Sequence, residues 1–86
     1  MKLKRSFLVH QEGEQKLLVP TGEAGFSGLV RCNASAGLIV SCLEHETTEA
    51  EILARMTAEW DIPAETAKRD LERILGELRQ IGAIDE

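Results

Sequence analysis

The sequence has 86 residues, of which 43% are hydrophobic and 29% charged, and its formal net charge is -5 at pH 7. This length suits one small domain, 1–86, with little room for both a core and an enclosed active-site cavity. The negative charge disfavours nucleic acid as a partner, and no apolar run approaches the roughly 18 residues of a membrane span. The start resembles no signal peptide, and Cys32 and Cys42 are too few for a disulfide framework, so we expect a cytoplasmic chain with free thiols.

The first third of the chain has the pattern of three short strands. Phe7 to His10 is the first candidate, Lys16 to Val19 the second, ending at Pro20, and Phe26 to Cys32 the third. Short polar connections between them predict an antiparallel meander. Gly28 inside the third strand indicates either a bulge or a place where another backbone comes close, and the residues leave both readings open.

After Asn33 the apolar residues recur at helical intervals. Asn33 is suited to cap a first helix from Ala34 to about Leu43, because its side-chain oxygen can accept an N–H of the first turn. The spacing Thr48-x-x-Glu51 predicts a capping box before a second helix. The residues of these two helices that we expect on the buried side are Leu38, Ile39, Cys42, Leu43, Ile52, Leu53, Met56 and Trp60.

A third helix follows the break WDIP, with Pro63 in its first turn, where a missing N–H does no harm. Its apolar residues recur at intervals of four and three, and Gly82 ends it. This core-facing stripe consists of Ala67, Leu71, Ile74, Leu78 and Ile81. Leu75 lies off the centre of the stripe, on a flank with Lys68 and Arg79 and with Glu72 just beyond, and we expect this flank to border a groove.

Three strands followed by three helices predict an α+β fold of the winged-helix kind, so DNA binding is the first function to consider. The charges of the third helix cancel, which argues against a basic recognition helix. They are Lys68, Arg69, Arg73 and Arg79 against Glu65, Asp70, Glu72 and Glu77. A winged-helix transcription regulator therefore stays only as the alternative function.

The sequence carries no clear catalytic, cofactor or metal signal. His10 and His45 have no partner at ligand spacing, and the two cysteines do not form a Cys-x-x-Cys pair. No serine elbow or phosphate-cradling glycine loop occurs. We therefore predict that the chain is not an enzyme and holds no cofactor or metal. The basic start, Lys2, Lys4 and Arg5, is expected to be a frayed terminus, with contact to an acidic partner surface as the alternative.

The order and spacing of these features resemble one family. A cap-like Asn33 opens the small-residue helix start NASAGLIVSCLE, an acidic and hydrophobic second helix ends in an aromatic residue before Asp61, and the last helix closes with IGAI. This combination resembles the PqqD family, small peptide-binding domains also called RiPP recognition elements. The resemblance covers nearly the whole chain and is clearest from Leu29 to Ile84. Where family members often have Leu before the Asn, this chain has Cys32.

The resemblance implies a non-catalytic adaptor. It would bind the leader segment of a ribosomally made precursor peptide as an extra strand beside the third strand, against the third helix, and present the peptide to a separate modifying enzyme. That enzyme is often of the radical S-adenosylmethionine type. Unpaired edge groups can orient such a guest strand, while side chains set specificity. The residues expected to meet the leader are Gly28, Leu29, Val30, Arg31, Lys68, Leu71, Glu72, Leu75 and Arg79.

Further readings stay open beside this one. A plain protein-interaction domain could keep the fold without the peptide groove, and two copies could associate as a homodimer through exposed strand edges.

Overall fold

The computed structural model describes residues 1–22 and 28–86. In these residues the strands precede the helices except for a short last strand, so the predicted α+β class is confirmed. The elements are β1 (Lys2–Leu3), β2 (Phe7–Glu12), β3 (Gln15–Pro20), β4 (Val30–Cys32), α1 (Ala34–Leu43), α2 (Glu49–Glu59), α3 (Ala64–Gln80) and β5 (Ile84–Asp85).

The strands β2, β3 and β4 form the antiparallel sheet that the sequence predicts, in the order β2-β3-β4. Between β2 and β3 the chain turns at Gly13, whose φ of 63° is a conformation that favours glycine. The register places Leu18 of β3 between Val9 of β2 and Val30 of β4. Because alternate side chains of a strand share one face, this row of apolar residues faces the helices.

The strand β4 is shorter than predicted. It begins at Val30, so Gly28 and Leu29 lie before it, while Phe26 and Ser27 lie outside the described residues. Gly28 has a φ of 124° and lies in a bend, which a side chain at that position would strain. The prediction that Gly28 sits inside the third strand is therefore wrong, because its backbone conformation departs from that of a strand.

The three helices begin and end close to their predicted limits, because their caps are local. The Ala36 N–H donates to Asn33 Oδ1 at 2.8 Å, and the Glu51 N–H donates to Thr48 Oγ1 at 3.2 Å. Pro63 is the cap of α3 rather than a residue of its first turn. No helix of the described residues is both long and apolar enough to cross a membrane.

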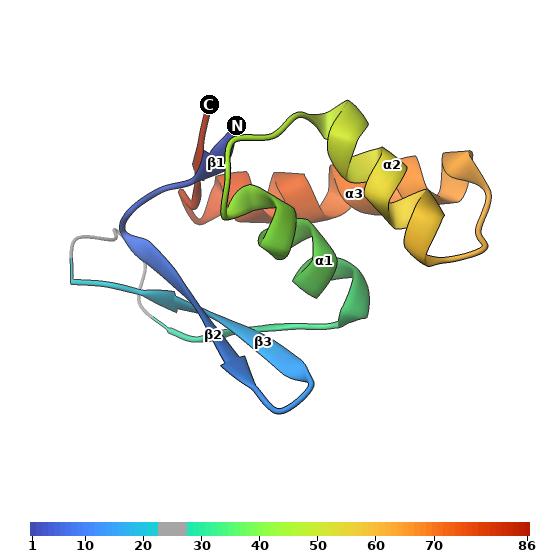
Figure 1. Cartoon of the computed structure of the whole chain (residues 1–86). Helices are drawn as coiled ribbons and strands as arrows, with labels where there is room; N and C mark the ends of the chain where they lie inside the picture. The colour runs from blue at the N-terminus through green and yellow to red at the C-terminus, as the bar shows by residue number, and fades with distance from the viewer. Residues whose placement is uncertain (23–27) are drawn as a thin grey trace.

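The core lies between the sheet and the helices, which are on one side of the sheet (Figure 1). Its largest fully buried side chains are Leu18, Ile39, Val40, Leu43, Ile52, Met56, Leu71 and Leu75. On α1 Val40 is completely buried although the prediction did not include it, while Leu38 and Cys42 are only half-buried. The predicted stripe of α3 is buried from Ala67 to Leu78.

The N-terminal segment is ordered, so the prediction of a frayed terminus is wrong. Lys2 and Leu3 of β1 pair with Asp85 and Ile84 of β5, and the Lys4 N–H donates to the Ala83 carbonyl at 2.8 Å. Figure 1 shows the two ends of the chain side by side, next to the last turn of α3. The backbone ladder between the ends holds the basic start in place.

Candidate functional site

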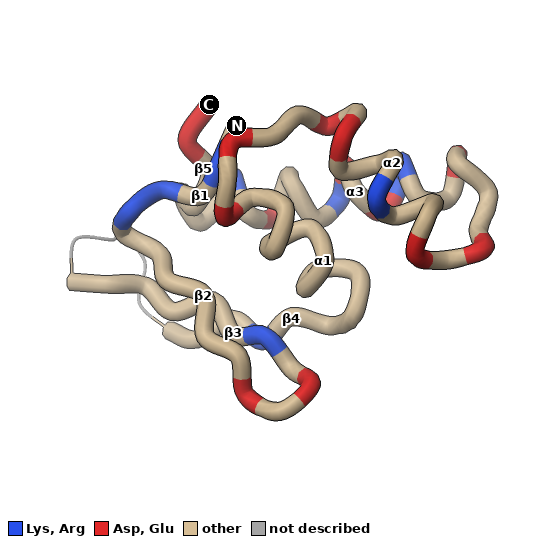
Figure 2. The backbone as a smooth tube through the Cα atoms, viewed as in Figure 1, with Lys and Arg blue, Asp and Glu red and all other residues tan. Residues whose placement is uncertain are grey.

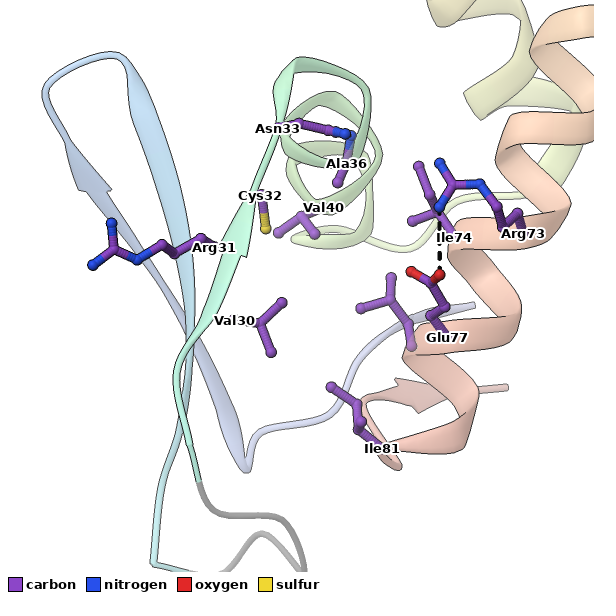
Figure 3. Close-up of a pocket in the computed structure, with 11 residues that line it drawn as sticks. Val30, Arg31, Cys32, Asn33, Ala36, Val40, Arg73, Ile74, Glu77 and Ile81 are labelled. Carbon is purple, nitrogen blue, oxygen red and sulfur yellow. Dashed lines mark hydrogen bonds and ion pairs between the residues drawn. The ribbon is translucent and has the colours of Figure 1, made fainter.

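The strand β4 lies at the edge of its sheet. Among the described residues it pairs with β3 alone, so its outer side carries backbone N–H and C=O groups that an extended chain could satisfy. Its side chains alternate across the strand. Val30 and Cys32 face the helices, whereas Arg31 points to the other side (Figure 3). A chain added to this edge would inherit the same alternation.

A cavity of about 230 Å³ lies between β4, α1 and α3, and we call it the β4–α3 groove. Val30, Val40, Ile74 and Ile81 point into it (Figure 3). Among the described residues its lining is Val30, Arg31, Cys32, Asn33, Ala36, Val40, Arg73, Ile74, Glu77, Leu78 and Ile81. An apolar floor with a charged border on α3 is a suitable surface for an apolar side chain of an extended peptide.

Arg73 forms the charged border of the groove together with two carboxylates of α3. Its guanidinium lies 2.6 Å from Asp70 Oδ1 and 3.3 Å from Glu77 Oε1. The hydrogen bond and the charge of Asp70 raise the pKa of Arg73, and Glu77 adds to this, so the side chain stays protonated. Exposed pairs of this kind add little stability, and here they fix where the guanidinium lies.

Cys32 contributes a neutral thiol to the wall of the groove. Burial raises the pKa of the Cys32 thiol, and the charge of Lys16 on the neighbouring strand lowers it in part. The Lys16 ammonium donates a hydrogen bond to the Ser41 hydroxyl. A buried, protonated cysteine behaves as a small apolar residue, so Cys32 adds to the apolar lining of the groove.

The strand residues of the predicted site are found in β4 or just before it. Val30 and Arg31 line the β4–α3 groove, although the Arg31 side chain points away from it. Gly28 and Leu29 precede the strand, and the Leu29 side chain is 50% exposed. Both therefore lie where a chain that approaches the free edge of β4 would pass.

The helix residues of the predicted site lie on the other flank of α3. Leu75 is completely buried, so the prediction that it borders a groove is wrong. Leu71 is buried beside it in the core. Arg79 does not line the groove. Its guanidinium pairs with Glu86 at 2.7 Å and with Glu49 of α2 at 3.4 Å, on the other face of α3.

The geometry of α3 explains why the predicted flank does not border the β4–α3 groove. Lys68 and Glu77 are nine residues apart, which at about 100° per residue places them about half a turn from one another. Lys68 and Glu72 are exposed and do not line the groove, whereas Glu77 does. The structure therefore brings together β4 and the flank of α3 with Arg73, Ile74, Glu77 and Ile81. It does not bring β4 together with the predicted flank.

The sequence contains only a weak signal for the groove residues of α3 that the prediction omits. Arg73 and Glu77 are four residues apart, a spacing typical of an ion pair on an exposed helix face, and the structure contains this pair. Ile74 and Ile81 were assigned to the core stripe, and both also face the groove. In the described ranges, no three side chains of His, Cys, Asp or Glu gather as metal ligands would.

Comparison with known proteins finds one matching family model and two similar solved structures. The family model described as Coenzyme PQQ synthesis protein D (PqqD) matches residues 6–84. The structure of TbiB1 in complex with the TbiA(beta) leader peptide is 22% identical, with a TM-score of 0.83 over 99% of this chain and 100% of that chain. Lasso peptide synthetase B1 complexed with the leader peptide is also 22% identical, with a TM-score of 0.78 over 95% and 93% of the two chains. No curated protein sequence matches this chain.

Proposed function

We propose that this chain, which belongs to the PqqD family, binds the leader segment of a ribosomally made precursor peptide as an additional strand beside β4. The observation that carries the proposal is the unpaired edge of β4 next to the apolar β4–α3 groove. The two similar structures each contain a leader peptide, and this supports a ligand of the same kind for this chain.

In this proposal the free edge and the groove have different tasks. The N–H and C=O groups of β4 orient the guest backbone whatever its sequence is. Every second leader side chain turns toward Val30, Val40, Ile74 and Ile81, and selection for apolar residues takes place there. Charged groups at the border, such as Glu77 and Arg73, set register and association rate more than affinity.

The proposed adaptor is a single non-catalytic recognition domain that acts in the cytoplasm. It raises the effective concentration of the precursor at a separate modifying enzyme, which does the chemistry. We expect an enzyme of the radical S-adenosylmethionine type, which brings its own clusters. A homodimer through strand edges would compete with the leader for β4, so we expect the peptide-bound form to be monomeric.

The DNA-binding alternative gains no support from the structure. Arg73 and Arg79 of α3 are both tied to carboxylates, and Figure 2 shows basic and acidic segments interspersed along the helices. A helix that enters the major groove needs an excess of cations for phosphate and base contacts. On α3 the two cations that form no ion pair within the described residues, Lys68 and Arg69, stand beside the exposed carboxylates of Glu65 and Glu72.

A titration tests the proposal. Isotopically labelled chain is titrated with the N-terminal segment of a short precursor peptide encoded beside its gene, with a scrambled peptide as control. We expect amide shifts at Val30 to Cys32 and at Ile74, Glu77 and Ile81, and none at Lys68 and Arg79. Shifts elsewhere, or equal shifts with the scrambled peptide, would contradict the proposed binding mode and leave a plain interaction domain.

A further inference from the structure

The free edge of β4 is short for a peptide ligand. β4 has three residues, and at about 3.3 Å per residue its edge is about 10 Å long. Such a ladder holds a guest strand with only a few backbone hydrogen bonds. A leader that binds specifically therefore needs contacts beyond the strand.

A second cavity continues the β4–α3 groove past the end of the strand. It has a volume of about 420 Å³ and lies between the first turn of α1 and the first half of α3. Its lining is Ser35, Ile62, Thr66, Arg69, Asp70 and Arg73. Arg73 lines both cavities, and Ser35 lies between Asn33 and Ala36, which line the groove. We call this second cavity the α1–α3 recess.

The recess has an apolar floor and one cation, Arg69, that has no ion-pair partner within the described residues. Ile62 is half-buried and packs against the core. Arg73 already pairs with both Asp70 and Glu77, so its charge is engaged within α3, and this cluster has one carboxylate more than it has cations. Arg69, in contrast, makes no ion pair or hydrogen bond within the described residues, and Glu65 one turn before it does not pair with it.

The surroundings of Arg69 leave this charge for a ligand. The first turn of α1, which forms the other wall, contains no acidic residue that could reach across. The hydroxyl groups of Ser35 and Thr66 lie in the same lining and can donate to a carboxylate. An acidic side chain would therefore find a cation and hydrogen-bond donors together in this recess.

We propose that the leader segment extends from the Cys32 end of β4 into the α1–α3 recess, where it places an apolar side chain on Ile62 and a carboxylate beside Arg69. The inference rests on the proposed function and adds the chemical class of the leader. The segment that pairs with β4 is apolar on one face, and the flank that leaves the strand at Cys32 contains Asp or Glu.

A peptide selection combined with a charge variant tests this inference. Random linear 16-residue peptides are selected for binding to the full chain, and we expect an acidic residue to be enriched on one side of an apolar segment. In a selected peptide that acid is then replaced by its amide. Arg69→Gln should weaken the acidic peptide about two- to fivefold, the range of exposed ion pairs, and leave the amide peptide unchanged.

Lys68→Gln is the matched control, because it removes the same charge one residue away on an exposed position outside the recess. It should change the affinity of neither peptide. Equal losses with the two variants would show general attraction between the chain and acidic peptides, and would overturn the assignment of Arg69.

Amide shifts separate failure of the recess from failure of the proposed function. Peptides that shift Val30 to Cys32 but leave Ser35, Thr66 and Arg69 unchanged would refute the recess while the β4–α3 groove stands. Selected peptides that shift none of these residues would refute the groove, and the recess with it.

Discussion

Replacing Leu75 with alanine distinguishes the two flanks of α3. Leu75 is completely buried in the core, so the truncation leaves a cavity. Such a change costs about 2 to 5 kcal/mol of unfolding free energy. A domain of this size has a total stability of about 4 to 13 kcal/mol. A loss of about 3 kcal/mol would lower the melting temperature by roughly 12 to 24 °C.

The assay measures stability and binding separately. Urea unfolding followed by circular dichroism gives the free energy, and titration with a peptide that binds the unchanged chain gives the affinity at a temperature where the variant is folded. We expect Leu75→Ala to keep its affinity within about twofold, because the side chain does not line the β4–α3 groove.

Ile81→Ala is the matched variant, because Ile81 is half-buried and points into the groove. We expect a smaller loss of stability, about 1 to 2 kcal/mol, and about a tenfold loss of affinity. If Leu75→Ala proved nearly as stable as the unchanged chain but lost affinity, the reasoning would be refuted. The binding side of α3 would then be the flank of Lys68 and Arg79.

Four further substitutions test the local physics of the fold. Gly82 has a φ of 75°, so Gly82→Ala should lower the free energy of unfolding in urea by about 1 kcal/mol. Gly76 lies in mid-helix with open space around it, so Gly76→Ala should raise the free energy of unfolding by about 0.5 to 1 kcal/mol. Asn33→Ala removes the cap of α1 and should cost about 1 kcal/mol; an unchanged midpoint would contradict the cap. The pKa of the Cys32 thiol is raised in the folded state, so the folded state favours the protonated thiol. The stability that this provides is complete below pH 9.0, the unfolded value, and is lost as the pH rises through the higher folded pKa. Cys32→Ala should remove this pH dependence of the unfolding free energy.

The helices could be predicted from the sequence because their limits depend on neighbouring residues. Asn33 and Thr48 bond to groups three residues ahead, and both caps are found as expected. The hairpin of β2 and β3 is also local, since its strands are joined by one short turn. In these elements the residues that decide the structure are a few positions apart.

Two errors in the fold have different causes, one long-range and one local. Lys2 pairs with Asp85 at the other end of the chain, and nothing in the residues near Lys2 indicates that partner. The start of β4 depends on the bend at Gly28, where a φ of 124° replaces the extended backbone that the pattern FSGLVRC suggests. Composition predicted a strand there, but the backbone conformation of one glycine set its limit.

The error about α3 shows what an amphipathic stripe leaves undetermined. The stripe fixes which face is buried, but it does not tell which of its two flanks is covered by another element and which is open. The prediction placed the groove at the apolar flank with Leu75. An extra apolar residue at about 100° from Ile74 broadens the buried face. Leu75 is buried among core residues on the side of α3 where Arg79 reaches Glu49 of α2. The opposite flank changes directly from Ile74 to the ion pair of Arg73 and Glu77, which remains exposed because no element covers it among the described residues. On a helix with a second helix packed beside it, the flank on which charges follow directly after the stripe is therefore the better candidate for an open groove.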